Sequence, residues 1–139
     1  MTKTQLQSAS INFAYDDALR RRIATFAGPI GDRELLDAYE SLLNDPTYDP
    51  SVDDLIDLRG VTHMAVTGAG LHRLIALYDD RLSNGYQTRA AIVAPSDVLY
   101  GVSRMFQMLR GDTNPDEVEV FRTLAGATRW LERRGQPAA

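Results

Sequence analysis

The sequence predicts an α/β fold, with a mixed, mainly parallel five-stranded sheet and four helices in the order β-β-α-β-α-β-α-β-α. Residues 55–58 and 90–94 are short apolar runs of the kind that forms strands covered on both faces. Both runs are followed by segments with apolar residues three and four positions apart, which is the pattern of amphipathic helices. Alternating strands and helices bring parallel pairing with right-handed crossovers. We therefore expect the two runs to lie side by side in the middle of the sheet.

The first two strands are predicted to form an antiparallel hairpin. Residues 11–15 alternate between apolar and polar positions as a strand does, and the two aspartates at 16–17 favour a turn. Residues 23–26 form the second strand, which we expect Gly28 and Pro29 to stop.

The first helix has the clearest pattern. Asp32 is its predicted N-cap, and Asp45 followed by Pro46 ends it. Its apolar stripe consists of Leu35, Leu36, Tyr39, Leu42 and Leu43.

The central stretch, residues 55–74, reads LIDLRGVTHMAVTGAGLHRL. After the strand at 55–58 we expect a polar turn that starts at Arg59, and then a helix that begins near Thr67 and Gly68. Thr67 suits the N-cap because its hydroxyl can accept from an otherwise unpaired backbone N–H. The apolar face of this helix consists of Leu71, Leu74, Ile75, Tyr78 and Leu82.

The C-terminal part continues the alternation. A third helix opens at residues 95–97, a last strand spans 118–121, and Thr123 caps a final helix. The expected core face of the third helix is Val98, Leu99, Val102, Met105, Phe106 and Leu109, and that of the final helix is Leu124, Ala127 and Leu131.

The composition is that of one ordinary domain. The chain has 139 residues, of which 44% are hydrophobic and 24% charged, as in globular proteins. We expect residues 1–9 to be a flexible N-terminus and residues 10–135 to be a single domain. The sequence shows no apolar run of the ~20 residues that a membrane span needs, no signal peptide and no cysteine. These features predict a cytoplasmic protein without integral membrane association.

The charge argues against nucleic acid as a partner. The net charge is −4, whereas phosphate binding needs a basic field. The basic run Arg20 to Arg22 is short, and we expect it to be a solvated strand start.

Catalysis finds little support in the sequence. His63 and His72 are the two histidines, and we expect the first in the turn and the second on the outer helix face, with no metal cluster around them. Ser96, His63 and Asp57 can be combined into a triad on paper, but no nucleophile elbow accompanies them. The GAG at residues 68–70 is neither a dinucleotide fingerprint nor a Walker motif. We therefore predict a protein that is not an enzyme, with no catalytic residue, no metal and no cofactor.

Asp57 stands inside an apolar strand, where a carboxylate needs a partner. Arg59 lies two residues on, hence on the same face, and turn N–H groups are the other candidates. A structural role and a place in the wall of a site both stay open.

The carboxyl ends of the parallel strands form a second candidate site, because open α/β sheets bind ligands there. The residues expected at this rim are Arg59, Gly60, Thr62, His63, Pro95, Ser96, Arg122 and Thr123. Helix N-termini near Thr67, Ser96 and Thr123 point partial positive charge the same way, which suits an anionic ligand. The alternative is that these residues are ordinary helix caps.

The third helix carries another cluster away from its expected core face, formed by Tyr100, Gly101, Arg104 and Met108. A glycine inside a helix costs ~1 kcal/mol relative to alanine. It suits the close approach of another surface, and such neighbours are typical of interfaces. Alternatively, Gly101 makes room for the chain's own second helix.

Four segments in order carry a family resemblance: GPIGDRELLDAYESLLNDPTYDP, LIDLRGVT, AIVAPSDVLYGVSRMFQML and EVEVFRTLAGATRWL. With them the chain resembles the STAS-like superfamily, the sulfate-transporter and anti-sigma-factor-antagonist domains that include the SpoIIAA-like proteins. It looks most like the small stand-alone bacterial members of STAS/SEC14 type, which are mostly uncharacterised. The resemblance spans about residues 10–134 and implies a regulatory domain that acts through protein–protein contact.

In the anti-sigma-antagonist branch, a D-S-S-G or D-S-T-G turn follows the LDLSGV strand, and a partner kinase phosphorylates its serine. Thr67 matches that hydroxyl residue and Gly68 matches the glycine. Ala65 and Val66 stand where the aspartate and first serine would be, and the turn is longer here. The resemblance makes Thr67 a candidate phosphorylation site, and the alternative is a plain helix cap.

The sequence thus favours a non-enzymatic domain that binds another protein, of unknown identity, with a homodimer as a further option. The runner-up is a small-ligand or lipid-binding module that uses the crevice at the strand ends. An enclosed apolar pocket with a few polar groups would favour the module, and a filled core with an exposed apolar patch would favour the protein contact. The predicted partner- or ligand-binding residues are Asp57, Arg59, His63, Thr67, Gly68, Ser96, Tyr100, Arg104 and Met108.

Overall fold

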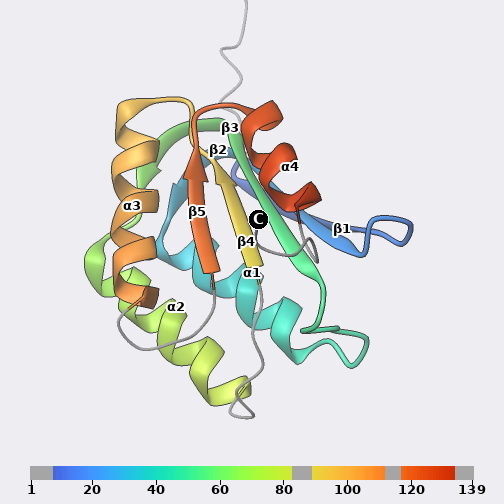
Figure 1. The fold of residues 1–139 in the computed structure, drawn as a ribbon. Helices are drawn as coiled ribbons and strands as arrows, with labels where there is room; N and C mark the ends of the chain where they lie inside the picture. The colour runs from blue at the N-terminus through green and yellow to red at the C-terminus, as the bar shows by residue number, and fades with distance from the viewer. Residues whose placement is uncertain (1–7, 83–88, 112–116, 134–139) are drawn as a thin grey trace, which may run out of the picture.

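The computed structural model describes residues 8–82, 89–111 and 117–133, which form one five-stranded sheet in the order β1-β2-β3-β4-β5 (Figure 1). The strands are β1 (Ser10–Asp16), β2 (Arg21–Gly31), β3 (Asp53–Ala65), β4 (Arg89–Val93) and β5 (Glu117–Phe121). β1 runs antiparallel to β2, and all other neighbours are parallel. Leu55 pairs with Ala91 between β3 and β4. The mixed sheet and the central adjacency of these strands are confirmed.

Helices cover the two faces of the sheet unequally. The helices α1 (Asp32–Asn44), α2 (Gly68–Arg81) and α3 (Asp97–Gly111) pack on one face, and α4 (Leu124–Glu132) packs on the other (Figure 1). The larger core lies beneath α1, α2 and α3, and the smaller one joins Leu55, Ala91 and Val93 to Ala127 and Leu131.

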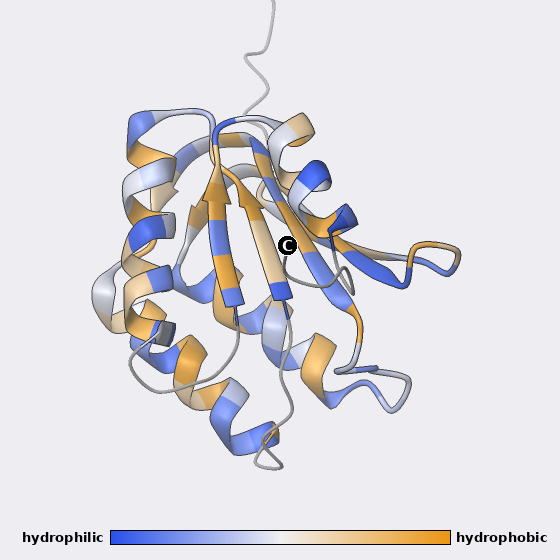
Figure 2. Cartoon of the chain, viewed as in Figure 1, coloured by the Kyte–Doolittle hydropathy of each residue, from blue (hydrophilic) through white to orange (hydrophobic). Residues whose placement is uncertain are grey.

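Strand burial follows this layering. β4 is apolar beyond Arg89, and Figure 2 shows that run in the interior of the sheet, where Ala91 and Val93 are fully buried. β5 is an edge strand, and it alternates exposed Glu117 and Glu119 with buried valines. Charge on an edge strand blocks pairing with another sheet, so this edge is protected.

β2 and β3 are longer than the sequence indicated, and two expectations fail together. Gly28 and Pro29 do not stop β2, and the residues after Arg59 are not a turn, because the two strands stay paired as far as Gly31 and Ala65. The register shifts twice along this pair. Gly28 lies at one of these shifts and has a φ of +79°. Glycine adopts this conformation readily because it has no Cβ to clash with the backbone. Glycine here permits a bulge where the sequence suggested an end.

The caps of the helices agree with the sequence in two cases and differ in one. Thr67 and Thr123 are N-caps whose side chains accept from Gly70 N and Gly126 N. The N-cap of α1 is Gly31 rather than the expected Asp32, and Glu34 Oε1 accepts from its N–H at 2.8 Å. Because Gly31 is the N-cap, the Asp32 carboxylate is available for another contact.

The expectation that the arginine run is solvated holds for Arg20 and is wrong for Arg21 and Arg22, which are buried. The Arg22 guanidinium lies 3.3 Å from Asp54 Oδ1, donates to Asp49 O at 2.7 Å, and stacks 4.4 Å from the Tyr48 ring. Arginine is compatible with burial only when such partners replace water.

No helix in the described ranges is long and apolar enough to cross a membrane. Residues 1–7 and 134–139 lie outside the described residues, so the predicted flexible N-terminus and domain limits stay predictions.

We predict that Gly28→Ala lowers the free energy of unfolding by about 1–3 kcal/mol, because φ is positive there and an added Cβ would lie 2.5 Å from Ser8 O. Urea denaturation measures the change. The matched control is Gly101→Ala, where a Cβ meets no atom within 4 Å, so stability should be unchanged or rise by about 1 kcal/mol. Equal effects at both glycines would contradict this account of the bulge.

Candidate functional site

The start of α2 is tied to the start of α1 by one carboxylate. Asp32 Oδ2 accepts from the Thr67 hydroxyl at 2.6 Å, and Asp32 Oδ1 accepts from Thr67 N at 2.8 Å. The Thr67 oxygen in turn accepts from Gly70 N at 3.1 Å. A Cβ on Gly70 would overlap the Asp32 carboxylate, which explains why the first turn of α2 carries glycine there. Sequence reasoning found the Thr67 cap but missed Asp32.

These contacts set the charge state of Asp32. The side-chain and backbone hydrogen bonds from Thr67 hold the pKa of the Asp32 carboxyl below its usual value, against a small opposing effect of burial. The Arg73 charge acts in the same direction. The N-terminus of α2 therefore faces an ionised carboxylate, and Thr67 itself stays exposed.

An apolar stripe lies exposed along α3. Val98, Met105 and Met108 are 63%, 41% and 66% exposed, and with Gly101 they fall within about 80° of arc around the helix. The expectation that Val98 and Met105 belong to the core face is wrong, because both side chains are exposed at the border of the buried arc of α3. Gly101 has open space around it, so it does not make room for α2.

The stripe adjoins the cap of α2. A Cβ on Gly68 would lie 3.8 Å from Met105 Sδ, so the first turn of α2 and the outer side of α3 form a continuous surface. We name this surface the α2–α3 face. It consists of Thr67, Gly68, Val98, Gly101, Met105 and Met108.

Two other residues predicted for the third helix lie away from this stripe. Tyr100 stacks against the guanidinium of Arg122 at 4.2 Å, and Arg104 donates to Gln107 Oε1 at 2.6 Å. Gln107 also donates to Val118 O at 2.6 Å, so these side chains turn toward β5. Of the predicted cluster, Gly101 and Met108 share the α2–α3 face.

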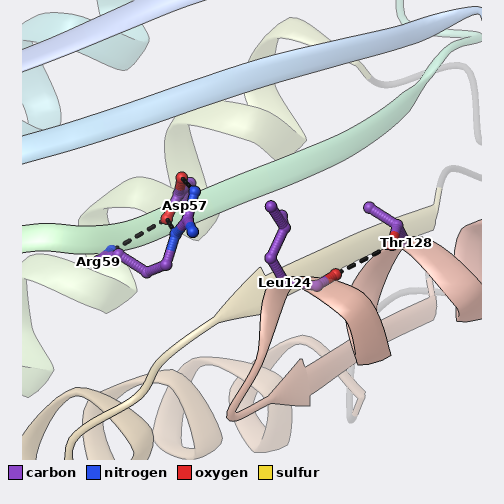
Figure 3. Close-up of polar contacts among 4 residues, drawn as sticks. All are labelled: Asp57, Arg59, Leu124 and Thr128. Atoms are coloured by element: carbon purple, nitrogen blue, oxygen red, sulfur yellow. Dashed lines mark hydrogen bonds and ion pairs between the residues drawn. The ribbon is translucent and has the colours of Figure 1, made fainter.

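Asp57 has the partner that the sequence suggested. Arg59 Nε and NH2 donate to its two carboxylate oxygens at 3.0 and 2.9 Å, and Arg59 N donates to Oδ1 at 3.0 Å. Figure 3 shows this pair on β3 beside the first turn of α4, where Leu124 O accepts from the Thr128 hydroxyl. Burial raises the pKa of the Asp57 carboxyl, but the hydrogen bonds and charge of Arg59 outweigh it, so the pKa is lowered.

Several polar groups at the predicted strand-end rim are engaged within the chain. Ser96 Oγ accepts from Leu99 N, and Arg122 donates to Asp97 Oδ1 at 2.9 Å. His63 lies exposed on β3, opposite Pro29 in the register. Ser96 follows the end of β4, whereas His63 lies within β3, and a ligand in this crevice stays a prediction.

A cavity of about 90 Å³ lies between the sheet and the three-helix layer. Most of its wall is apolar, with Met64, Val66 and Val102 among the lining residues, and Asp54, Ser103 and Arg110 also line it. Burial raises the pKa of the Tyr39 and Tyr78 hydroxyls in the same wall, so both stay neutral. The space between the sheet and the three helices is therefore incompletely filled.

The described residues contain no group of three or more histidine, aspartate or glutamate side chains arranged to hold a metal ion.

With a mixed five-stranded sheet and these four helices, the chain has a SpoIIAA-like α/β fold. No protein-family model and no curated protein matches the sequence. Among solved structures, it is similar to an uncharacterised DUF3478-family protein with a SpoIIAA-like fold from Shewanella loihica, with 17% identity and a TM-score of 0.55 over 94% of this chain and 99% of that one. It is also similar to an anti-sigma factor antagonist from Mycobacterium paratuberculosis, with 22% identity and a TM-score of 0.51 over 90% and 95%. These matches confirm the fold that the STAS-like resemblance implied.

We predict that Asp32 and Thr67 are energetically coupled. Asp32→Ala and Thr67→Ala should each cost about 1–2 kcal/mol of unfolding free energy, because each removes a helix-cap hydrogen bond. The double variant should cost less than the sum by about 1 kcal/mol, since both changes remove the same contact. Urea denaturation of the four proteins gives the coupling, and strict additivity would show that the bond contributes nothing.

We predict that Asp57→Asn lowers stability by about 1 kcal/mol at neutral pH, a value reduced because Arg59 is half exposed. Because the folded-state pKa of Asp57 lies below 3.8, its contribution is present above that pH and is lost as the pH falls through the folded-state value. The gap between wild type and variant should therefore close on acidification.

Denaturation curves between about pH 7 and pH 2.5 measure this gap. The control is Asp80→Asn, which removes the exposed pair that Asp80 forms with Arg81 and should change little at any pH. A wild-type advantage that grows on acidification would contradict the assignment.

Proposed function

We propose that this chain is a STAS-type regulatory domain of the cytoplasm that acts by binding another protein through the α2–α3 face, and not by catalysis. The observation that carries the proposal is the exposed stripe of Val98, Met105 and Met108 beside the capped N-terminus of α2. Large apolar side chains grouped on a surface indicate a contact site, because water contact there is unfavourable. Methionine suits such a surface because its side chain adapts to the partner.

The geometry of α3 indicates what the partner presents. Gly101 lies between Val98 and Met105 along the stripe, with open space above it. A helix or strand of the partner can approach the α3 backbone closely at that point and place apolar side chains on both sides. The anti-sigma factor antagonist from Mycobacterium paratuberculosis, by its name, works through a protein partner, and that likeness supports the same mode of action here.

Thr67 gives this face a means of control. Its hydroxyl is exposed and hydrogen-bonded to Asp32, so phosphorylation removes that bond and sets a phosphate beside a carboxylate. The N-terminus of α2 partly compensates the added charge. The added charge changes a surface next to Met105 from apolar to strongly anionic. A partner that binds the unmodified face is thereby released.

The test is affinity capture from the source cell with the full chain as bait. Met105→Asp should reduce the recovered partner by about tenfold or more, because it places an unpaired charge in an apolar contact. The matched control is Leu19→Asp, which adds the same charge at an exposed leucine (54%) in the β1–β2 hairpin. A partner lost equally with both variants, or retained with both, would contradict the assignment to the α2–α3 face.

A second pair of variants tests whether phosphorylation of Thr67 controls binding of the partner. Thr67→Glu should weaken capture of the same partner, whereas Thr67→Ala should bind it in cells without release. If Thr67→Ala preserves every cellular response of the wild type, phosphorylation of Thr67 is excluded as the means of control, while binding through the face is unaffected.

A further inference from the structure

The cavity behind α3 combines a mainly apolar wall with a few polar groups, which is the composition of small-molecule sites. Its volume of about 90 Å³ is well above the ~15 Å³ that one water needs and well below the ~300 Å³ of sites for drug-sized ligands. An occupant must therefore be small, on the scale of a single aromatic ring.

Charge balance argues for a neutral occupant. Asp54 and Arg110 are the charged residues among those that line the cavity. Asp54 lies 3.3 Å from Arg22 Nε, and Arg110 NH1 lies 3.4 Å from Asp79 Oδ1. Each of these charges already has a counterion. A carboxylate or an amine in the cavity would therefore meet no unbalanced opposite charge to offset the free-energy cost of its desolvation.

Ser103 supplies a hydrogen-bonding group. It is 4% exposed, lies on the core side of α3 and lines the cavity. A buried serine in a helix usually donates to the carbonyl four residues earlier, as Thr128 does with Leu124 O in α4. Within the described part of the chain, no such bond engages the Ser103 hydroxyl. Its donor and acceptor capacity is therefore directed to the cavity.

From the volume, the apolar wall, the paired charges and this hydroxyl, we propose that the cavity binds a small neutral molecule, mainly apolar, with one hydrogen-bonding group that meets Ser103. A phenol or a short alcohol has this chemistry. The site is distinct from the strand-end crevice and from the α2–α3 face, and it does not depend on the protein contact proposed above.

The test uses methyl-labelled methionine and NMR, because the methionines report on different places. Met64 lines the cavity, whereas Met105 and Met108 are exposed. Phenol, benzene and benzoate are titrated into the full chain. We expect phenol and benzene to shift the Met64 methyl signal saturably without moving those of Met105 and Met108, and benzoate to leave Met64 unshifted.

Two variants complete the test. Ser103→Ala should weaken phenol binding by about five- to tenfold, the value of one hydrogen bond, and change benzene binding by less than about twofold. Val102→Phe should fill the cavity and abolish both. If Val102→Phe does not fold, the comparison of phenol and benzene binding in Ser103→Ala still tests the proposal.

In the titrations, the proposal is overturned by no saturable shift of Met64 with any probe, by parallel shifts of the exposed methionines, or by benzoate binding as tight as phenol. Unchanged phenol binding in Ser103→Ala also overturns it, since the assigned hydrogen bond would then be absent.

Discussion

The parallel pairing of β2 with β3 along their whole length is the constraint on which the rest of the structure depends. It ends at Gly31 opposite Ala65, so the chain leaves both strands at the same edge of the sheet. Asp32 and Thr67, the residues that start the next two helices, therefore emerge together, and one carboxylate can hold both ends. The bulges that allow this length depend on Gly28 and Gly60, where a Cβ would meet backbone atoms at 2.5 and 2.8 Å.

The sequence predicted the elements whose signal is local. β4 is apolar beyond Arg89 and lies in the interior of the sheet, and Thr67 and Thr123 cap their helices as their positions indicated. The sequence did not predict the outer half of β3, because its residues do not form an apolar run. α4 does not cover this half, so one face is in contact with solvent, and polar residues such as Thr62 and His63 stand there. That half is held by backbone pairing with β2, and a sequence pattern of side chains does not record which distant backbone will provide it.

Dependence on distant parts of the chain also explains why the sequence did not predict the contacts of the candidate site. The contact of Asp32 with Thr67 spans 35 residues, and nothing local distinguishes an aspartate that caps its own helix from one that supports the next. Val98 and Met105 fit the apolar period of α3, yet their exposure depends on where α2 ends up beside them. The burial of Arg22 was not predicted for a related reason, because it depends on partners such as Asp54, which comes from another strand.

α3 carries parts of both proposed sites on one helix. Its outer side carries Met105 and Gly101 on the α2–α3 face, and its inner side carries Ser103 on the cavity wall. A helix that shifts against the sheet changes both at once, because interiors pack as solids and do not deform on one side only. A cavity occupant that alters the seating of α3 must then alter partner affinity, and by linkage the partner alters occupant affinity by the same factor. Val102 is next to Gly101 and Ser103 is two residues from it, so any such coupling spans less than one helical turn.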